Sequence, residues 1–303
     1  MSKMTDIQMK LRDLLPEIAL INNEPMAKHT SFRIGGAVEV MAFPKTPEEL
    51  SQIMKAADQL GVKTAVLGAG TNILAPDAGI PGLVVCLKDC LGGMERLDDT
   101  HIRVMAGVTM TRAALYAASL GLTGLEFSHG IPGSVGGGVY MNAGAYGGEI
   151  CQVCCGATVM NRRGEMRHLT GEEMEFSYRH SVLEDSGELV VSADFALTPG
   201  NEEQIRSRMK ELMAKRSASQ PLDKPSAGST FKRPVGGYAA ALIDGAGLKG
   251  YRVGDAAVSE KHAGFVVNLG QATAEDVKKL MAQVSEIVNE KSGIRLEPEV
   301  RIW

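Results

Sequence analysis

Three kinds of side chain in this sequence could act on an anionic substrate. Arg179, in the run FSYRHS, could bind a planar carboxylate through two parallel hydrogen bonds, or it could form a structural salt bridge. Ser229, in the run SAGSTFKRP, could protonate a strongly basic intermediate, or it could simply form a turn. Glu297 and Glu299 alternate as in a strand and would project from one face, where paired acids are usually solvated. Residue type alone leaves both roles open for each of them.

Two glycine-rich segments could hold a ligand close to the backbone. Residues 130–148 (GIPGSVGGGVYMNAGAYGG) contain eight glycines among nineteen residues and no charge, so they do not resemble a flexible linker. The second segment, GAGTN, begins at Gly68 after an expected strand, but Ile73 stands where a Rossmann motif needs glycine. The two segments could embrace one flat or phosphate-bearing ligand, or they could be tight turns in a twisted sheet.

Composition limits the class of protein. A chain of 303 residues predicts two or three packed units. A net charge of -4 and only 5% aromatic residues argue against nucleic acid as a partner. The N-terminus lacks an uncharged signal-peptide core, and no apolar run is long enough for a membrane span. We therefore expect a cytoplasmic protein with no membrane contact, and the sequence indicates no obligate protein partner.

The cysteines and histidines indicate no metal site. Five cysteines, an odd number, argue against a disulfide framework. Cys151, Val153 and Cys155 alternate as in a strand that faces a core, and we favour this over half of a zinc site. The six histidines show no ligand spacing.

Periodicity predicts the elements that must position these residues. An alternation of strands and helices fills the first 200 residues, and a boundary follows at Pro199-Gly200-Asn201. The expected strands cover residues 38–43, 63–67, 82–87, 101–105, 151–161, 188–197, 264–268 and 295–303, with a hairpin turn at 162–164. The expected helices cover residues 7–16, 47–60, 111–120, 201–215, 238–244 and 273–291.

Five motifs occur in the order found in one family. The motifs are the glycine-rich segment, the run YRHS, the run SAGSTFKRP, the run SEKHAGF and the run LEPEV. Together they closely resemble the UDP-N-acetylenolpyruvoylglucosamine reductases, over nearly the whole chain from His29 to Arg301. The resemblance implies an α+β architecture with an FAD-binding fold of the vanillyl-alcohol-oxidase (PCMH) type in two subdomains, plus a smaller α+β substrate-binding domain.

The resemblance also implies domain limits and a cofactor cradle. Residues 1–200 would form the FAD-binding region (subdomains 1–83 and 84–200), residues 201–293 the substrate-binding domain, and residues 294–303 the segment with the catalytic glutamate. Backbone N–H groups of two loops would hold the FAD pyrophosphate. The implied FAD-binding residues are Gly68, Ala69, Gly70, Thr71, Asn72, Ile131, Pro132, Gly133, Ser134, Val135, Gly136 and Gly137.

The implied reaction reduces the enolpyruvyl ether of UDP-N-acetylglucosamine enolpyruvate to UDP-N-acetylmuramate, with NADPH as the hydride donor. Arg179 and Glu299 would polarise the substrate carboxylate, and Ser229 would protonate the carbon. Glu299 must be protonated or paired with a cation, because an ionised acid alone would oppose the developing charge, and burial should raise its pKa. Glu297 is the alternative acid.

By charge and position alone, Lys215, Arg216 and Lys249 are candidate partners for the UDP diphosphate, and Tyr178 beside Arg179 is a further candidate substrate-binding residue. Phe195 runs almost directly into the 201–215 helix, so the chain matches the shorter second type of the family, which lacks an inserted tyrosine segment. Two other readings stay open: a flavoprotein of the same fold that oxidises a hydroxyl, and a nucleotide-sugar sensor that has lost its flavin. The set of Ser229, Arg179 and Glu299 argues against the oxidising flavoprotein. The intact glycine loops argue against the sensor.

Overall fold

The computed structural model describes residues 4–303, and this part of the chain divides into two compact units. The first unit comprises residues 4–22, Glu39–Ala69 and Pro81–Lys215, and the second comprises Asn23–Val38, Gly70–Ile80 and Arg216–Trp303. Each unit has an apolar core of its own. Each unit is built from segments that are distant in sequence. The expected domain limits are continuous ranges of sequence, and they stay predictions.

The first sheet of the first unit has the strand order β1-β2-β5-β3, and β3 pairs in parallel with β5. Helix α2 begins as predicted: the Thr46 hydroxyl accepts the Glu49 N–H at 3.2 Å, and Pro47 occupies the first turn. It ends at Gln59, and its C-cap Leu60 precedes Gly61, which has φ +62°. The elements here are α1 (Asp6–Leu14), β1 (Ala19–Pro25), β2 (Ala37–Phe43), α2 (Pro47–Gln59), β3 (Thr64–Leu67) and β5 (Ile80–Cys86). The short helix η1 (Met26–Lys28) follows β1 in the chain and belongs to the second unit.

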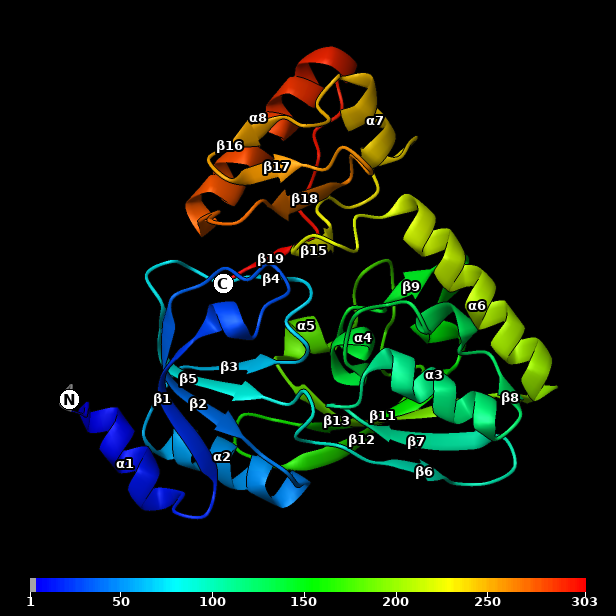
Figure 1. Cartoon of the computed structure of the whole chain (residues 1–303). Coiled ribbons are helices and arrows are strands. Elements are labelled where there is room, and N and C mark those ends of the chain that lie inside the picture. The colour runs from blue at the N-terminus through cyan, green and yellow to red at the C-terminus, as the bar shows by residue number, and fades with distance from the viewer. Residues whose placement is uncertain (1–3) are drawn as a thin grey trace. The chain divides into compact units, whose positions relative to one another are not determined.

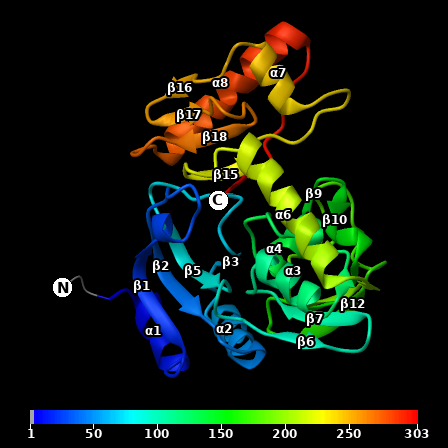
Figure 2. The same cartoon turned by 45° about the vertical axis from the view of Figure 1, so that its right-hand side comes forward.

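The second sheet of the first unit has five antiparallel strands in the order β12-β11-β13-β7-β6. Helices α3 and α4 lie beside this sheet (Figure 2). The hairpin turn predicted at 162–164 joins β11 to β12. The larger elements are β6 (Met94–Arg96), β7 (His101–Met105), α3 (Met110–Ser119), α4 (Val135–Tyr140), β11 (Cys154–Met160), β12 (Met166–Thr170), β13 (Leu189–Ala196) and α6 (Glu202–Ser219).

Short elements connect these strands and helices. They are β8 (Leu122–Thr123), η2 (Glu126–Ser128), β9 (Gly144–Ala145), β10 (Gly148–Glu149), η3 (Ile150–Gln152), α5 (Leu183–Ser186) and β14 (Thr198–Pro199). The glycine-rich segment therefore contains a helix, α4, and one strand pair, β9 with β10, rather than a continuous loop.

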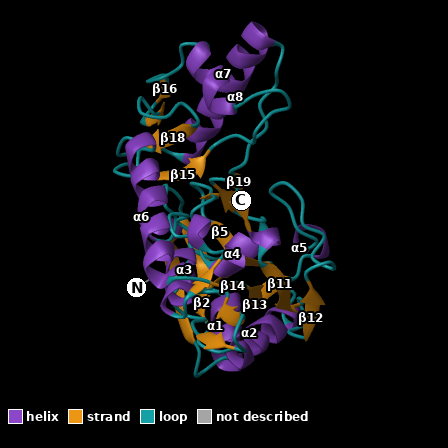
Figure 3. Cartoon of the chain, turned by 90° about the vertical axis from the view of Figure 1, so that its right-hand side faces the viewer, coloured by secondary structure: helices purple, strands orange, loops and turns teal. Residues whose placement is uncertain are grey.

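The second unit has a sheet in the order β15-β18-β17-β16, with α7 and α8 packed together beside it (Figures 1 and 3). Helix α8 buries the apolar face predicted from its periodicity, including Val277, Leu280 and Val284. Its first turn donates two backbone N–H groups to the Asp77 carboxylate, at 2.8 and 3.2 Å. The elements are β4 (Ile73–Leu74), β15 (Ser226–Ser229), α7 (Ala239–Gly245), β16 (Arg252–Val253), β17 (Ala256–Val258), β18 (Phe265–Asn268), α8 (Ala274–Ser292) and β19 (Arg301–Ile302).

The predicted core face of the 151–161 strand is wrong. Helix η3 takes up residues 150–152, so the strand begins only at Cys154, which is buried, while Cys151 and Cys155 are exposed. Strand alternation then places Cys155 on the opposite face from Cys154. All five cysteines are free, and residues 4–303 contain no cluster of three or more His, Cys, Asp or Glu residues that could hold a metal.

The predicted terminal strand over residues 295–303 is also wrong for most of its length. Only Arg301–Ile302 is a strand, paired in parallel with Ile73–Leu74. A strand extends only as far as its partner, and β4 has two residues. No helix within residues 4–303 has both the length and the apolar character needed to cross a membrane.

Candidate active site

A turn of four backbone N–H groups lies directly after β3. Within residues 4–303 the N–H groups of Gly68, Ala69, Gly70 and Thr71 donate to no protein acceptor. Gly70 has φ +63°, and a side chain there would also overlap the carbonyl of His29. Successive amides in such a turn form a concave site for an anion. This turn therefore fits a bound phosphate group.

The second predicted cofactor loop, residues 131–137, lies next to Gly68 in the first unit. A Cβ atom on Gly68 would overlap the Ser134 hydroxyl and lie 3.9 Å from the Gly137 nitrogen. Ser134 caps helix α4 by accepting the Gly137 N–H at 3.4 Å. The N–H groups of Ile131, Gly133, Val135 and Gly136 donate to protein carbonyls within the unit. The close approach of the two loops explains why both are rich in small residues.

His129 precedes this second loop in the chain. Its Nδ1 atom is buried and has no hydrogen-bond partner within residues 4–303. Burial lowers the pKa of the imidazole, which favours the neutral ring at neutral pH. A buried nitrogen of this kind indicates that water or a bound molecule supplies the missing hydrogen bond.

Glu299 is held from both sides through its backbone. Its N–H donates to the Thr230 carbonyl at 2.8 Å, and its own carbonyl accepts the Asn72 side-chain amide at 3.1 Å. The Arg301 N–H donates to the Asn72 carbonyl at 2.9 Å, which continues the pairing of β19 with β4. The second unit thus joins the end of the first glycine loop to the segment that carries the candidate acid.

Ser229 lies one residue before Thr230, at the end of β15 and opposite Phe265 of β18. Thr230 is buried, and its hydroxyl accepts the Val266 N–H at 2.9 Å. The Ser229 side chain is exposed and makes no hydrogen bond within residues 4–303. The structure therefore brings Ser229 and Glu299 onto neighbouring, hydrogen-bonded segments and leaves the hydroxyl available.

Arg179 lies in the first unit, in a tight turn closed by Ser177 and His180. The two closing residues exchange backbone hydrogen bonds of 3.1 and 3.2 Å. Arg179 has φ +57°, a strained value for a residue with a long side chain, and such strain concentrates at functional sites. Its guanidinium donates to the Gly144 carbonyl at 3.3 Å and lies 5.2 Å from the centre of the Tyr178 ring.

The other predicted substrate-binding residues have local partners. Tyr178 occupies the same turn as Arg179 and is about half exposed. In the second unit, Arg216 donates to the Gln220 side chain at 2.8 Å, and Lys249 pairs with Asp244 at 2.8 Å. These contacts neither join Arg216 to Lys249 nor place either beside Ser229. Their binding role stays a prediction.

The alternative acid Glu297 has different surroundings from Glu299. Its side chain is 76% exposed, and its carboxylate lies 3.9 Å from the ammonium group of Lys232. The strand alternation that placed the two acids on a common face does not apply, because residues 295–300 are not a strand. Glu299 is only partly exposed and is fixed by two backbone bonds, so it is the better positioned of the two.

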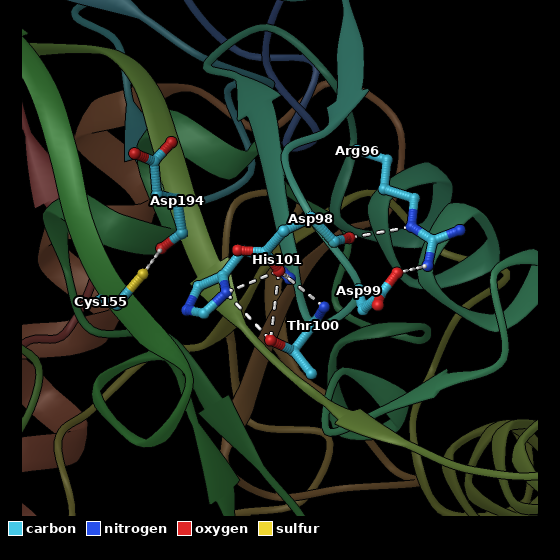
Figure 4. A network of polar contacts seen from close by, with 7 residues as sticks. All are labelled: Arg96, Asp98, Asp99, Thr100, His101, Cys155 and Asp194. Carbon is cyan, nitrogen blue, oxygen red and sulfur yellow. Dashed lines mark hydrogen bonds and ion pairs between the residues drawn. The ribbon is translucent and has the colours of Figure 1, made fainter.

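A polar network at the turn between β6 and β7 contains none of the predicted site residues (Figure 4). The Asp98 carboxylate accepts the N–H groups of Thr100 and His101 at 2.7 and 2.8 Å, and it contacts the His101 ring at 2.9 Å. These bonds hold the pKa of Asp98 well below its usual range. On the neighbouring strands, the Cys155 thiol donates to the Asp194 carbonyl at 3.3 Å. The network stabilises the hairpin.

Two residues that hold parts of the fold together are not predicted from the sequence. Asn142 is buried and adopts φ +44°, and Asp77 caps α8 from a segment about 200 residues earlier. The signal for Asn142 was its place in the run MNAG, since asparagine tolerates the left-handed region better than most residues. No local signal marks Asp77, because its partner is a helix distant in sequence.

Comparison with known proteins first defines the class. A model of the FAD-binding domain matches residues 38–170. The fold is similar to that of a glucooligosaccharide oxidase from Acremonium strictum, with a TM-score of 0.51, 14% identity, and coverage of 98% of this chain and 61% of that one. The chain is thus an FAD-binding protein of the PCMH-type fold, which confirms the predicted α+β fold class.

The particular family follows from higher similarity. A model of the C-terminal domain of UDP-N-acetylenolpyruvoylglucosamine reductase matches residues 220–303. The UDP-N-acetylenolpyruvoylglucosamine reductase of Agathobacter rectalis is 48% identical over an alignment of 299 positions that covers 95% of each chain. The crystal structure of the reductase from Thermus caldophilus matches with a TM-score of 0.77 and 34% identity, over 95% of this chain and 99% of that one. The chain belongs to the UDP-N-acetylenolpyruvoylglucosamine reductase family of oxidoreductases, which confirms the family predicted from the five motifs.

Proposed function

We propose that this chain reduces UDP-N-acetylglucosamine enolpyruvate to UDP-N-acetylmuramate in peptidoglycan synthesis, with FAD as cofactor and NADPH as hydride donor. The observation that carries the proposal is the pairing of an available Ser229 hydroxyl with Glu299 on two segments joined by the 2.8 Å Glu299–Thr230 hydrogen bond. Family membership supplies the substrate, and this backbone contact supports a proton donor and an acid on adjacent segments.

FAD bound here would supply the transfer of hydride from NADPH to the methylene carbon of the enolpyruvyl group. The turn Gly68–Thr71 would bind the FAD pyrophosphate through its available N–H groups, and Asn72 would close that turn against Glu299. Residues 131–137 would pack against the cofactor, because their small side chains permit close approach.

The chain's own residues would handle the substrate's charge and proton. Arg179 would bind the carboxylate and stabilise the negative charge that spreads over it after hydride addition. Glu299 would share that task, and Ser229 would donate its hydroxyl proton to the carbon. Tyr178, Arg216 and Lys249 would contact the nucleotide-sugar.

We further propose residues 1–200 as the FAD-binding region, 201–293 as the substrate-binding domain and 294–303 as the segment with the catalytic acid. The activity belongs to cell-wall biogenesis, and through it to cell shape and division, in the cytoplasm. The absence of a spanning helix within residues 4–303 is compatible with that location.

The proposed function has a direct optical test. The purified protein should be yellow, lose its flavin absorbance when NADPH is added without oxygen, and regain it when UDP-N-acetylglucosamine enolpyruvate follows. UDP-N-acetylglucosamine, which lacks the enolpyruvyl group, is the control and should leave the flavin reduced. Failure of the enolpyruvyl substrate to restore the absorbance would contradict the proposed activity and favour a flavoprotein with another substrate.

Replacement of Gly70 by alanine should remove most of the bound FAD. The new methyl group would overlap the His29 carbonyl, and φ +63° is unfavourable for alanine by about 1 kcal/mol, so the turn must open. Gly61→Ala is the matched control, because Gly61 has φ +62° but no atom within 4 Å of the added carbon. The ratio of flavin to protein absorbance should fall at least about tenfold in G70A and stay near the wild-type value in G61A. Full FAD occupancy in G70A would mean that this turn does not bind the cofactor.

A further inference from the structure

Asn142 is a buried amide that forms three hydrogen bonds with separate parts of the first unit. It is 1% exposed. Its Oδ1 atom accepts the Cys151 N–H at 2.9 Å, and its Nδ2 atom donates to the Ser177 carbonyl at 3.0 Å and to the Glu149 carboxylate at 3.1 Å. The orientation of the amide is unambiguous, because a backbone N–H faces the oxygen while a carbonyl and a carboxylate face the nitrogen.

The Ser177 carbonyl belongs to the turn that presents Arg179. The same carbonyl accepts the His180 N–H at 3.2 Å, so it closes the turn and also receives the Asn142 amide. Arg179 adopts φ +57° between these two closing residues. A residue in this region keeps its conformation only where its surroundings hold it. The Asn142 bond is therefore placed to maintain the strained conformation.

A second set of contacts connects Asn142 to the guanidinium of Arg179. Gly144 of β9, whose carbonyl accepts that guanidinium at 3.3 Å, is paired with Glu149 of β10. Glu149 is also the carboxylate that accepts the Asn142 amide. Asn142 thus connects the backbone of the arginine turn to the hairpin that orients the arginine side chain.

We propose that Asn142 is a positioning residue for Arg179, which locks the arginine turn and the β9–β10 hairpin into one frame. The assignment rests on the proposed function, in which Arg179 binds the substrate carboxylate. Asn142 itself is buried, so it acts through Arg179 and does not touch the substrate. A displacement of about 1 Å in a group that orients substrate costs about 100-fold in rate, so loss of this frame should be visible in the step that uses Arg179.

The test uses flavin-loaded full-length protein with Asn142→Asp or Asn142→Ala. N142D keeps an acceptor for the Cys151 N–H but puts an oxygen against the Ser177 carbonyl and the Glu149 carboxylate, so it breaks only the connections to the turn and the hairpin. N142A removes all three bonds and serves if N142D does not retain flavin. Ser51→Ala is the control, since it removes another buried hydrogen bond of this unit, from Ser51 to the Gly164 carbonyl at 2.7 Å.

Stopped-flow measurements without oxygen separate the two half-reactions. Reoxidation of reduced flavin by the enolpyruvyl substrate should slow by about 10- to 100-fold in N142D, while flavin reduction by NADPH stays near the rate of S51A. In an R179A background, N142D should slow reoxidation no further, because the residue it positions is already gone. An effect that adds in full to R179A, or one no larger than that of S51A, would overturn the proposal. Wild-type reoxidation in R179A alone would instead refute the role of Arg179 in the proposed function, and the positioning role with it.

Discussion

Replacement of Ser229 by alanine should slow reoxidation of the reduced flavin by substrate by about 10²- to 10⁴-fold, the usual contribution of a positioned proton donor. Reduction of the flavin by NADPH should proceed at nearly the wild-type rate, because that step needs no proton on the substrate carbon. The structure favours this separation. The Ser229 hydroxyl forms no internal hydrogen bond within residues 4–303, so its removal breaks no contact of the fold.

Ser226→Ala is the matched control for S229A. It removes a hydroxyl from the opposite end of the same strand, β15, and should change neither half-reaction by more than about twofold. Both variants should melt within a few degrees of the wild-type protein, since each deletes a surface or half-buried hydroxyl. Equal rates of reoxidation in S229A and the wild type would remove Ser229 from the chemistry and leave solvent as the proton source.

Local sequence signals predicted the elements that carry their own start and stop residues. Thr46, Pro47 and Gly61 define α2 within one or two residues, and alternation predicted β7 at His101–Met105. These predictions succeed because caps and alternation are properties of neighbouring residues. The errors came where a partner decides the outcome. The 3-10 turn at residues 150–152 moves the start of the strand to Cys154, three residues later than predicted. The two-residue partner β4 limits the terminal strand.

The same distinction between local signals and distant partners applies to the candidate site. Residue type and motif order nominate Arg179, Ser229 and Glu299 as candidates, but no local pattern predicts the contacts that hold them. The amide of Asn72 reaches the Glu299 carbonyl across 227 residues of sequence, and Asn142 reaches the Ser177 carbonyl across 35. Contacts over such separations exist only after the units have folded. The sequence therefore indicates the candidate reactive groups. It does not indicate the contacts that fix their positions.

Replacement of Glu299 by glutamine should slow substrate-dependent reoxidation by about 10²-fold or more, and the same change at Glu297 should cost no more than about twofold. Glutamine keeps the size and the polar end of glutamate, so neither variant leaves a cavity. The difference follows from placement. Two backbone hydrogen bonds fix Glu299 beside the Ser229 segment, whereas the Glu297 side chain is 76% exposed and lies 3.9 Å from the Lys232 ammonium group. An exposed pair of this kind contributes little.

Comparison of E299Q with E297Q in the two half-reactions decides which acid acts. Flavin reduction by NADPH should be near wild type in both variants, which shows that the cofactor site is intact. Lys232→Met provides a further check, because it removes the partner of Glu297 and should leave reoxidation unchanged if that acid is a bystander. The reverse pattern, with slow reoxidation in E297Q and normal reoxidation in E299Q, would transfer the acid's role to Glu297. The backbone bonds from Asn72 and Thr230 would then serve to hold the segment rather than the reacting group.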